Sequence, residues 1–200
     1  MKKIIITIGR QFGSGGRALG RRLAKELQIG YYDKELLVEA AKESGLSPEF
    51  LTQYDEASTN SFLYSIAMNP SNMLFGENGG MSVVQMAAKA QREAVLNVAE
   101  RGSCVIVGRC ADDILHNEEN LLSIFVTADE EDRIKRVVRR DKITEKEAKA
   151  QMIKMDKKRK SHYTFNTGRE WGAAENYGLC LNMSRISMDK AVAMIKEAIS

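Results

Sequence analysis

The sequence has few of the residues that stabilise small secreted domains or mark membrane spans. It contains only three cysteines and two prolines, and an odd cysteine count in 200 residues does not suggest a disulfide framework. Cys104 and Cys180 lie within apolar runs, so we expect both to be buried. No apolar stretch approaches the roughly 20 residues that a bilayer-spanning helix needs. The first residues lack the pattern of a signal peptide, so we expect a cytoplasmic protein with no membrane partner.

Charge of one sign is also not in large excess. The 30 basic residues outnumber the 27 acidic ones by three, which is too small a surplus to predict nucleic-acid binding. The two histidines, His116 and His162, stand in no spacing typical of a metal site or a catalytic triad. We predict one domain over residues 1–200, with a substantial core, while the oligomeric state stays open.

What the sequence does contain is an alternation of apolar runs with amphipathic segments. Strands are expected at Lys2–Ile8, Ile29–Asp33, Ser103–Gly108, Leu121–Val126 and Tyr177–Asn182. Helices are expected at 17–27, 34–43, 82–101, 129–140 and 187–199, and from the capping box Thr144–Glu147 to about Arg159. Residues 45–80 hold both prolines and are expected to form an insertion with short helices and a mobile loop. This order predicts an α/β fold with a parallel sheet, whose ligands bind beyond the carboxyl ends of the strands.

A glycine-rich segment follows the first predicted strand. Its glycines allow backbone N–H groups to converge on an anion, and the helix that follows adds the positive end of its dipole. The segment lacks the lysine and the Ser/Thr that end a phosphate-binding loop, and Arg10 or Arg17 could supply the missing cation. The alternative is a tight turn without a ligand. The predicted phosphate-binding residues are Arg10, Gly13, Ser14, Gly15, Gly16, Arg17 and Ala18.

Several segments together resemble a known family over almost the whole chain. They are Ile6–Arg17, Tyr31–Asp33, Val107–Arg109, Ala128–Arg133 with Arg136, Asp156–Arg159 and Tyr163–Asn182. Each is similar to a motif of the cytidylate kinase-like branch of the P-loop nucleoside monophosphate kinases. The resemblance implies a three-layer P-loop NTPase fold with a five-stranded parallel sheet, a helical acceptor-binding insertion at about 34–80 and a helical lid at about 141–170. It also implies ATP as phosphoryl donor, Mg²⁺, and an acceptor such as CMP or dCMP.

Within this resemblance, arginines are the candidates for binding phosphate and neutralising charge. Arg109 matches the arginine that contacts the acceptor nucleotide, and Asp33 either orients the acceptor or caps a helix at residue 34. The predicted catalytic residues are Arg17, Arg133, Arg136 and Arg159, although a solvated helix face with surface ion pairs is the alternative for the arginines on helices. Asp112 and Asp113 either hold Mg²⁺ through water or cap a helix, and the metal ligands stay unknown.

The sequence departs from authentic cytidylate kinases at four positions. Arg10 replaces their first loop glycine, Gly16 their lysine, Ala18 their threonine and Cys110 the aspartate after the acceptor arginine. We therefore keep three hypotheses: a kinase that transfers the ATP γ-phosphate to a nucleoside monophosphate, a nucleotide-binding regulatory protein that has lost transfer chemistry, and a kinase of another small metabolite. In each case the expected partners are small molecules.

Overall fold

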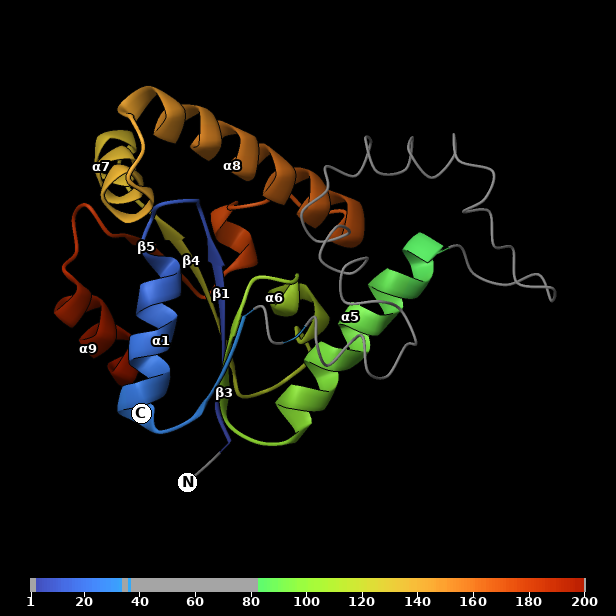
Figure 1. The fold of residues 1–200 in the computed structure, drawn as a ribbon. Helices are drawn as coiled ribbons and strands as arrows, with labels where there is room; N and C mark the ends of the chain where they lie inside the picture. Colours follow the sequence, from blue (N-terminus) through green and yellow to red (C-terminus); the bar gives the residue numbers. More distant parts are fainter. Residues whose placement is uncertain (1–2, 34–35, 37–82, 200) are drawn as a thin grey trace.

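The computed structural model describes residues 3–33, 36 and 83–199, which form a parallel sheet with helices around it (Figure 1). The predicted helix at 34–43 and the predicted insertion at 45–80 lie outside these residues, apart from Leu36. The strands are β1 (Ile5–Arg10), β2 (Gly30–Tyr32), β3 (Cys104–Val107), β4 (Leu121–Thr127) and β5 (Leu179–Asn182). They follow the order β2-β3-β1-β4-β5, and all neighbours are parallel. The prediction of an α/β fold with a five-stranded parallel sheet is confirmed.

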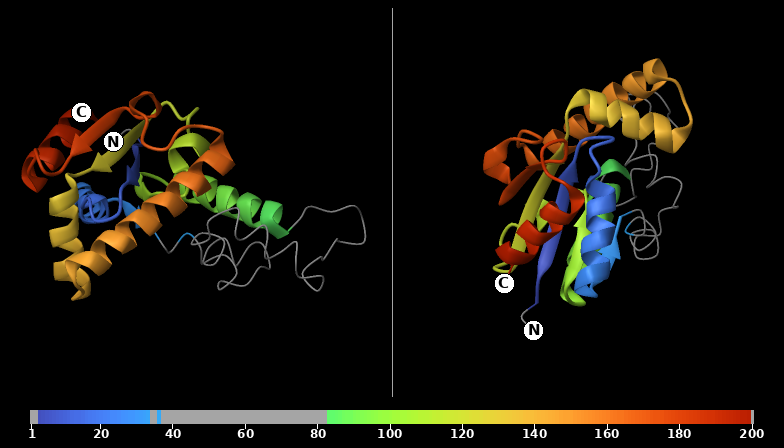
Figure 2. Two further views of the ribbon diagram at one scale, coloured as in Figure 1. Left: turned by 90° about the horizontal axis from the view of Figure 1, so that it is seen from above. Right: turned by 90° about the vertical axis from the view of Figure 1, so that its left-hand side faces the viewer.

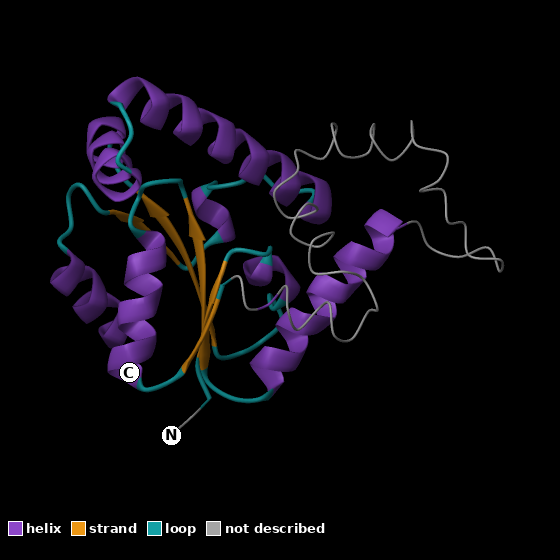
Figure 3. Cartoon of the chain, viewed as in Figure 1, coloured by secondary structure: helices purple, strands orange, loops and turns teal. Residues whose placement is uncertain are grey.

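Helices cover both faces of the sheet, as Figure 3 shows. On one face lie α1 (Gly16–Leu27) and α9 (Met188–Ala198), and on the other lie α5 (Val83–Glu100) and the short α6 (Ala111–Ile114). Because neighbouring side chains of a strand point to opposite faces, Ile6 packs with Leu23 and Ile195, whereas Ile5 packs with Val95 of α5. Both faces are buried, which explains why the strands are continuous apolar runs rather than alternating ones.

Two further helices lie across the carboxyl ends of the strands (Figures 1 and 2). They are α7 (Glu130–Asp141) and α8 (Glu145–Thr167). The predicted capping box begins α8: the Thr144 hydroxyl accepts from the Glu147 N–H at 3.3 Å, and the Glu147 carboxylate accepts from the Thr144 N–H at 2.8 Å. These helices place their side chains over the edge of the sheet where parallel α/β proteins bind ligands.

The prediction that this helix ends near Arg159 is wrong, because α8 continues to Thr167. Its last turns are poor in strong helix formers, and tertiary contacts keep them helical. The hydroxyl of Tyr163 donates to the Asp112 carboxylate at 2.6 Å, while Thr167 bonds back to the carbonyl of Tyr163 at 2.8 Å. The helix ends only where Gly168 turns left-handed, with φ of 71°.

Two other expectations need correction. β1 does not end at Ile8 but extends through Gly9 to Arg10, which pairs with Val126 of β4. Cys180 is exposed rather than buried, because β5 is an edge strand and its Leu181 side faces the core that α9 completes. Within the described ranges, every helix is too short or too polar to span a lipid bilayer.

Candidate functional site

The glycine-rich segment forms a loop between β1 and α1. Gly13 and Gly15 take left-handed backbone angles, with φ of 77° and 96°, and Gly15 is the N-cap of α1. A Cβ built on Gly15 would meet nothing within 4 Å, so space is open directly above the first turn of the helix. The Ser14 hydroxyl donates to the Gln11 carbonyl at 2.9 Å, which places it inside the loop rather than toward this space. The first-turn N–H groups of α1 therefore face an open position, as an anion site requires.

Arginines of α7 bind the carbonyl groups of this loop. Arg133 donates from Nε to the Phe12 carbonyl at 2.8 Å, and Arg136 donates from Nη1 to the Ser14 carbonyl at 3.0 Å. Asp156 of α8 accepts from the Phe12 N–H at 2.7 Å and forms an ion pair with Arg133. Two predicted catalytic residues, Arg133 and Arg136, thus contact loop carbonyls, where they fix the loop's conformation.

The Phe12 ring itself lies beneath two guanidinium groups. The Arg140 guanidinium carbon is 4.8 Å from the ring centroid and that of Arg159 is 5.5 Å away. Such cation–π contacts orient both arginines over the loop. We did not predict a role for Phe12 from the sequence, although a large aromatic residue inside a glycine-rich turn was a usable signal.

Four arginines gather beside Asp33 at the ends of β1 and β3. Asp33 is only 3% exposed, and its carboxylate lies 2.6 Å from Arg17 Nε and 3.8 Å from Arg10 Nη2. Burial, with Arg10 next, lowers the pKa of Arg109 to about 9, and burial lowers the pKa of both Arg10 and Arg159. Burial is the largest cause for all three arginines, and buried cations that lie close together form a site that a bound anion would stabilise.

Arg109 projects from a turn with unusual backbone angles. Three successive residues after β3 have positive φ: Gly108 at 78°, Arg109 at 64° and Cys110 at 53°. For side chains other than glycine this conformation costs about 1–2 kcal/mol per residue. Gln91 of α5, which is buried, donates from its amide to the Arg109 carbonyl at 3.4 Å and supports the turn. We did not single out Gln91 from the sequence, because helical periodicity marks it only as a residue facing inward.

Two cavities meet at this cluster. The first, about 1000 Å³, lies along the loop and α1 and includes Gly15, Gly16 and Arg136 in its wall. The second, about 530 Å³, lies between the turn after β3 and α8 and includes Arg109 and His162. The residues that line both cavities are Arg10, Phe12, Arg17, Arg140 and Arg159. The junction between the two cavities is therefore strongly basic.

Aromatic side chains also line the second cavity. Trp171 and Tyr177 lie in its wall, and both rings pack against Phe125, at centroid distances of 5.3 and 5.0 Å. Beside them is the Tyr163–Asp112 pair, in which burial raises the pKa of the Asp112 carboxyl. The expectation that Asp112 or Asp113 caps a helix is wrong, because Cys110 is the N-cap of α6. Among the described residues there is also no cluster of His, Cys, Asp and Glu side chains suited to a metal ion.

Comparison with known proteins identifies the family of this chain. Residues 5–185 match the sequence model of the Cytidylate kinase-like family. The chain belongs to this family. It is 27% identical to the cytidylate kinase of Methanopyrus kandleri over 205 residues, which cover 98% of this chain and 93% of that protein.

Solved structures agree with this assignment. An uncharacterized protein from Eubacterium ventriosum is 32% identical, with a TM-score of 0.72 over 98% of both chains. The shikimate kinase of Bacteroides thetaiotaomicron is 15% identical, with a TM-score of 0.52 over 98% of both chains. At that identity the likeness concerns the fold alone, and it confirms the fold of P-loop kinases for this member of the family.

Proposed function

We propose that this protein is a nucleotide kinase that transfers the γ-phosphate of ATP to a nucleoside monophosphate such as CMP or dCMP. The observation that carries the proposal is the meeting of two cavities at a basic junction above the glycine loop. A kinase needs this arrangement, because donor and acceptor phosphates repel each other and must be brought together. Membership in the cytidylate kinase-like family supports the same reading.

The first cavity suits the donor. Its open position above Gly15 offers backbone N–H groups to the β- and γ-phosphates, and the cations of α1 and α7 surround the remaining space. Ala18 provides no hydroxyl for a metal, so Mg²⁺ would arrive as part of the Mg–ATP substrate and keep water and phosphate oxygens as ligands. We therefore assign Gly13, Gly15 and Gly16 to the ATP phosphates.

The second cavity suits the acceptor, because its wall contains both arginines and aromatic rings, which a nucleotide's phosphate and base would contact. Arg109 and its neighbours would bind the monophosphate, whereas Trp171 and Tyr177 offer aromatic surface for a base. In the transfer, an oxygen of the acceptor monophosphate attacks the γ-phosphorus while its bond to the β,γ-bridging oxygen breaks, which leaves ADP. The arginines at the junction neutralise charge on the transferring group, and Arg159 is the α8 residue placed to take part.

The lid at about 141–170 and the acceptor-binding insertion at about 34–80 belong to the same proposal. Closure of a lid excludes water from the transfer. We expect a bisubstrate analogue to protect residues 141–170 from limited proteolysis. An unchanged cleavage rate while the analogue is bound would count against the lid.

The test of the function is ADP production from Mg–ATP with a panel of nucleoside monophosphates, nucleosides and other hydroxyl-bearing metabolites, against an acceptor-free control. We expect transfer to at least one pyrimidine monophosphate. Binding of an ATP analogue without transfer to any acceptor would support the nucleotide-binding regulatory protein, which the missing lysine favours. Transfer to a metabolite alone would identify a different kinase.

A further inference from the structure

Arg10 occupies a central position between the two cavities. It is the last residue of β1, it lines both cavities, and its side chain is 15% exposed. Its carbonyl accepts a hydrogen bond from Arg159 Nη1 at 3.0 Å, so α8 fixes its backbone. A residue placed in this way can contact a group that passes from one cavity to the other.

Two glycines make room for the Arg10 side chain. A Cβ built on Gly108 would lie 1.9 Å from Arg10 Nη1, and a Cβ built on Gly16 would lie 2.7 Å from the Arg10 Cβ. Both distances are shorter than real contacts, so neither position tolerates a side chain while Arg10 keeps its conformation. The stem of Arg10 thus passes Gly16 of the phosphate loop, and its guanidinium group lies on Gly108 of the acceptor turn.

This packing links two departures from authentic cytidylate kinases. Gly16 stands where they have the loop lysine, and Arg10 stands where they have a glycine. In this structure a lysine at position 16 would clash with Arg10, whereas the glycine accommodates it. The absence of a lysine at position 16 and the presence of an arginine at position 10 are therefore sterically coupled, because a side chain at position 16 would overlap that of Arg10.

Arg10 and Arg17, the two candidates for the cation that replaces the lysine, differ in their distance from the carboxylate of Asp33. Arg17 lies 2.6 Å from the Asp33 carboxylate and is 44% exposed, so it already has a close partner. Arg10 lies 3.8 Å from the same carboxylate, and burial lowers its pKa, with a further contribution from Arg17. Asp33 opposes this shift without cancelling it, so an anion at the junction would further stabilise the charged form of Arg10.

We infer that Arg10 is the catalytic cation that replaces the loop lysine and contacts the transferring phosphoryl group. Arg17 acts with Asp33 as a positioning residue. This inference rests on the proposed function, and it assigns the transfer step to a residue that the family's usual motif does not contain.

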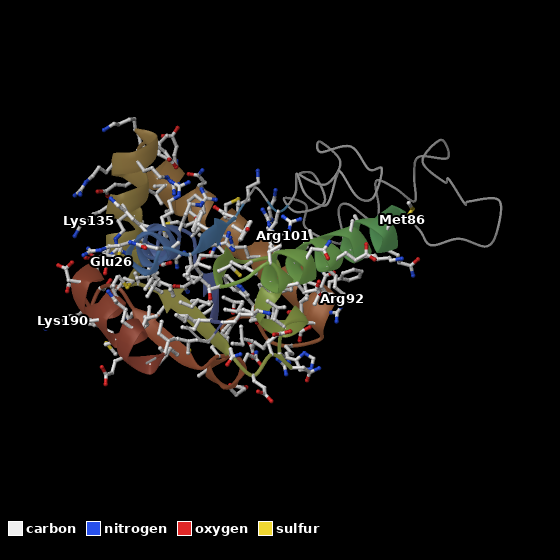
Figure 4. All side chains as sticks on the ribbon, turned by 90° about the horizontal axis from the view of Figure 1, so that it is seen from below. Glu26, Met86, Arg92, Arg101, Lys135 and Lys190 are labelled. Carbon is white, nitrogen blue, oxygen red and sulfur yellow. The ribbon has the colours of Figure 1, made fainter. Side chains whose placement is uncertain are left out.

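The test is a reciprocal exchange assayed with Mg–ATP and the best acceptor. We expect Arg10→Ala to lower kcat at least 100-fold with little change in acceptor KM, and Arg10→Lys to recover part of the loss. Gly16→Lys alone should be inactive because of the clash, whereas Gly16→Lys combined with Arg10→Gly should regain at least tenfold over either single variant. Arg92→Ala, at an exposed position of α5 labelled in Figure 4, is the control and should match the parent protein.

Stability distinguishes catalysis from a structural role. Arg10→Ala removes a buried cation from a cluster of cations, so its melting temperature without ligand should equal or exceed that of the parent. A lower melting temperature together with unchanged kcat per folded molecule would overturn the assignment. So would an active Arg10→Ala variant beside an inactive Arg17→Ala variant.

If the parent protein transfers no phosphate, the proposed function fails. Binding of a bisubstrate probe then tests whether Arg10 contacts phosphate at the junction between the two cavities. The probe is an adenosine–cytidine pentaphosphate measured by calorimetry. Loss of at least 30-fold in affinity in Arg10→Ala would keep Arg10 as the phosphate ligand of the junction. Equal affinities would exclude it.

Discussion

The loop after β1 and the turn after β3 leave neighbouring strands of one sheet, and both pass through left-handed backbone. In the loop the positive φ angles belong to Gly13 and Gly15, whereas in the turn they continue from Gly108 into Arg109 and Cys110. Glycine is required where the backbone itself is to meet the ligand, because a Cβ would occupy the approach. In the turn the chain retains the side chain of Arg109 at the cost of strain, as we expect if that side chain contacts the acceptor.

The two segments are also held differently. The loop is fixed through its carbonyls and the Phe12 N–H by charged residues of α7 and α8. The turn is supported by the neutral amide of Gln91 from α5. A displacement of α7 and α8 should therefore loosen the loop after β1 and leave the turn after β3 in place, so experiments can separate the two segments.

The largest expected effect concerns the side chain of the turn. Arg109→Ala removes charge-assisted hydrogen bonds to the acceptor phosphate, each contributing about 1.5–3 kcal/mol. We expect CMP affinity to fall by about 30- to 100-fold while ATP affinity changes less than threefold, measured by calorimetry. Arg101→Ala, at an exposed position labelled in Figure 4, is the matched control. Equal loss of both ligands would remove the division of roles between loop and turn.

The corresponding change in the loop acts on the backbone. Gly15→Val places a β-branched residue at φ of 96°, above the first turn of α1. Affinity for a nonhydrolysable ATP analogue should fall at least tenfold, or about 1.4 kcal/mol. Gly102→Val carries a similar strain at φ of 148° before β3, away from the cavities, and should retain the affinity. A folded Gly15→Val protein with normal affinity would mean that the loop binds no phosphate.

A smaller effect is expected when the contact of α8 with the loop is weakened. Asp156→Asn keeps an acceptor for the Phe12 N–H but loses the charge that pairs with Arg133. ATP affinity should fall about fivefold, near 1 kcal/mol, with CMP affinity unchanged. Glu118→Gln removes a carboxylate from an ion pair with Lys3, away from both cavities, and serves as the control. A greater loss of CMP than of ATP would place Asp156 in the acceptor site instead.

The matching substitution for the other segment weakens the hydrogen bond that supports the turn after β3. Gln91→Met removes the donor to the Arg109 carbonyl but fills a similar volume. CMP affinity should fall about threefold to fivefold, as expected for a neutral hydrogen bond of about 1 kcal/mol, and ATP affinity should not change. Gln85→Met, at an exposed position of the same helix, provides the comparison. If ATP affinity fell as well, the conformation of the turn after β3 would be coupled to that of the loop after β1.

A separate effect, on folding stability rather than on ligand affinity, concerns the acid range. Burial, with a contribution from Arg109, lowers the pKa of His162 to about 4. The unfolded chain then binds the extra proton first, so stability falls as the pH drops from about 6.5 toward 4. Urea unfolding between pH 7 and pH 4.5 should show a weaker pH dependence in His162→Gln than in the parent. His116→Gln should behave like the parent, and identical curves for all three proteins would contradict the assignment.

The sequence by itself determined the sheet and the loop. Runs such as Ile4–Ile8 and Ser103–Gly108 are short, apolar and rich in β-branched residues, and they alternate with amphipathic helices, which favours buried parallel strands. Glycines directly before a helix mark a place where backbone amides can meet an anion, and this needs no knowledge of the rest of the chain. The fold and the location of the candidate site were predictable because both depend on local pattern and on the geometry of parallel sheets.

Tertiary structure alone decided which groups each arginine contacts. The sequence favoured Arg17 as the phosphate ligand, with Arg10 as the second choice, and left Arg133, Arg136 and Arg159 as further candidates. Contacts more than 100 residues apart in the chain direct Arg133 and Arg136 to the loop carbonyls. The space for Arg10 likewise depends on Gly108, which approaches only when β1 and β3 pair. A side chain's role follows from the groups that surround it, and those groups are set by packing between distant segments.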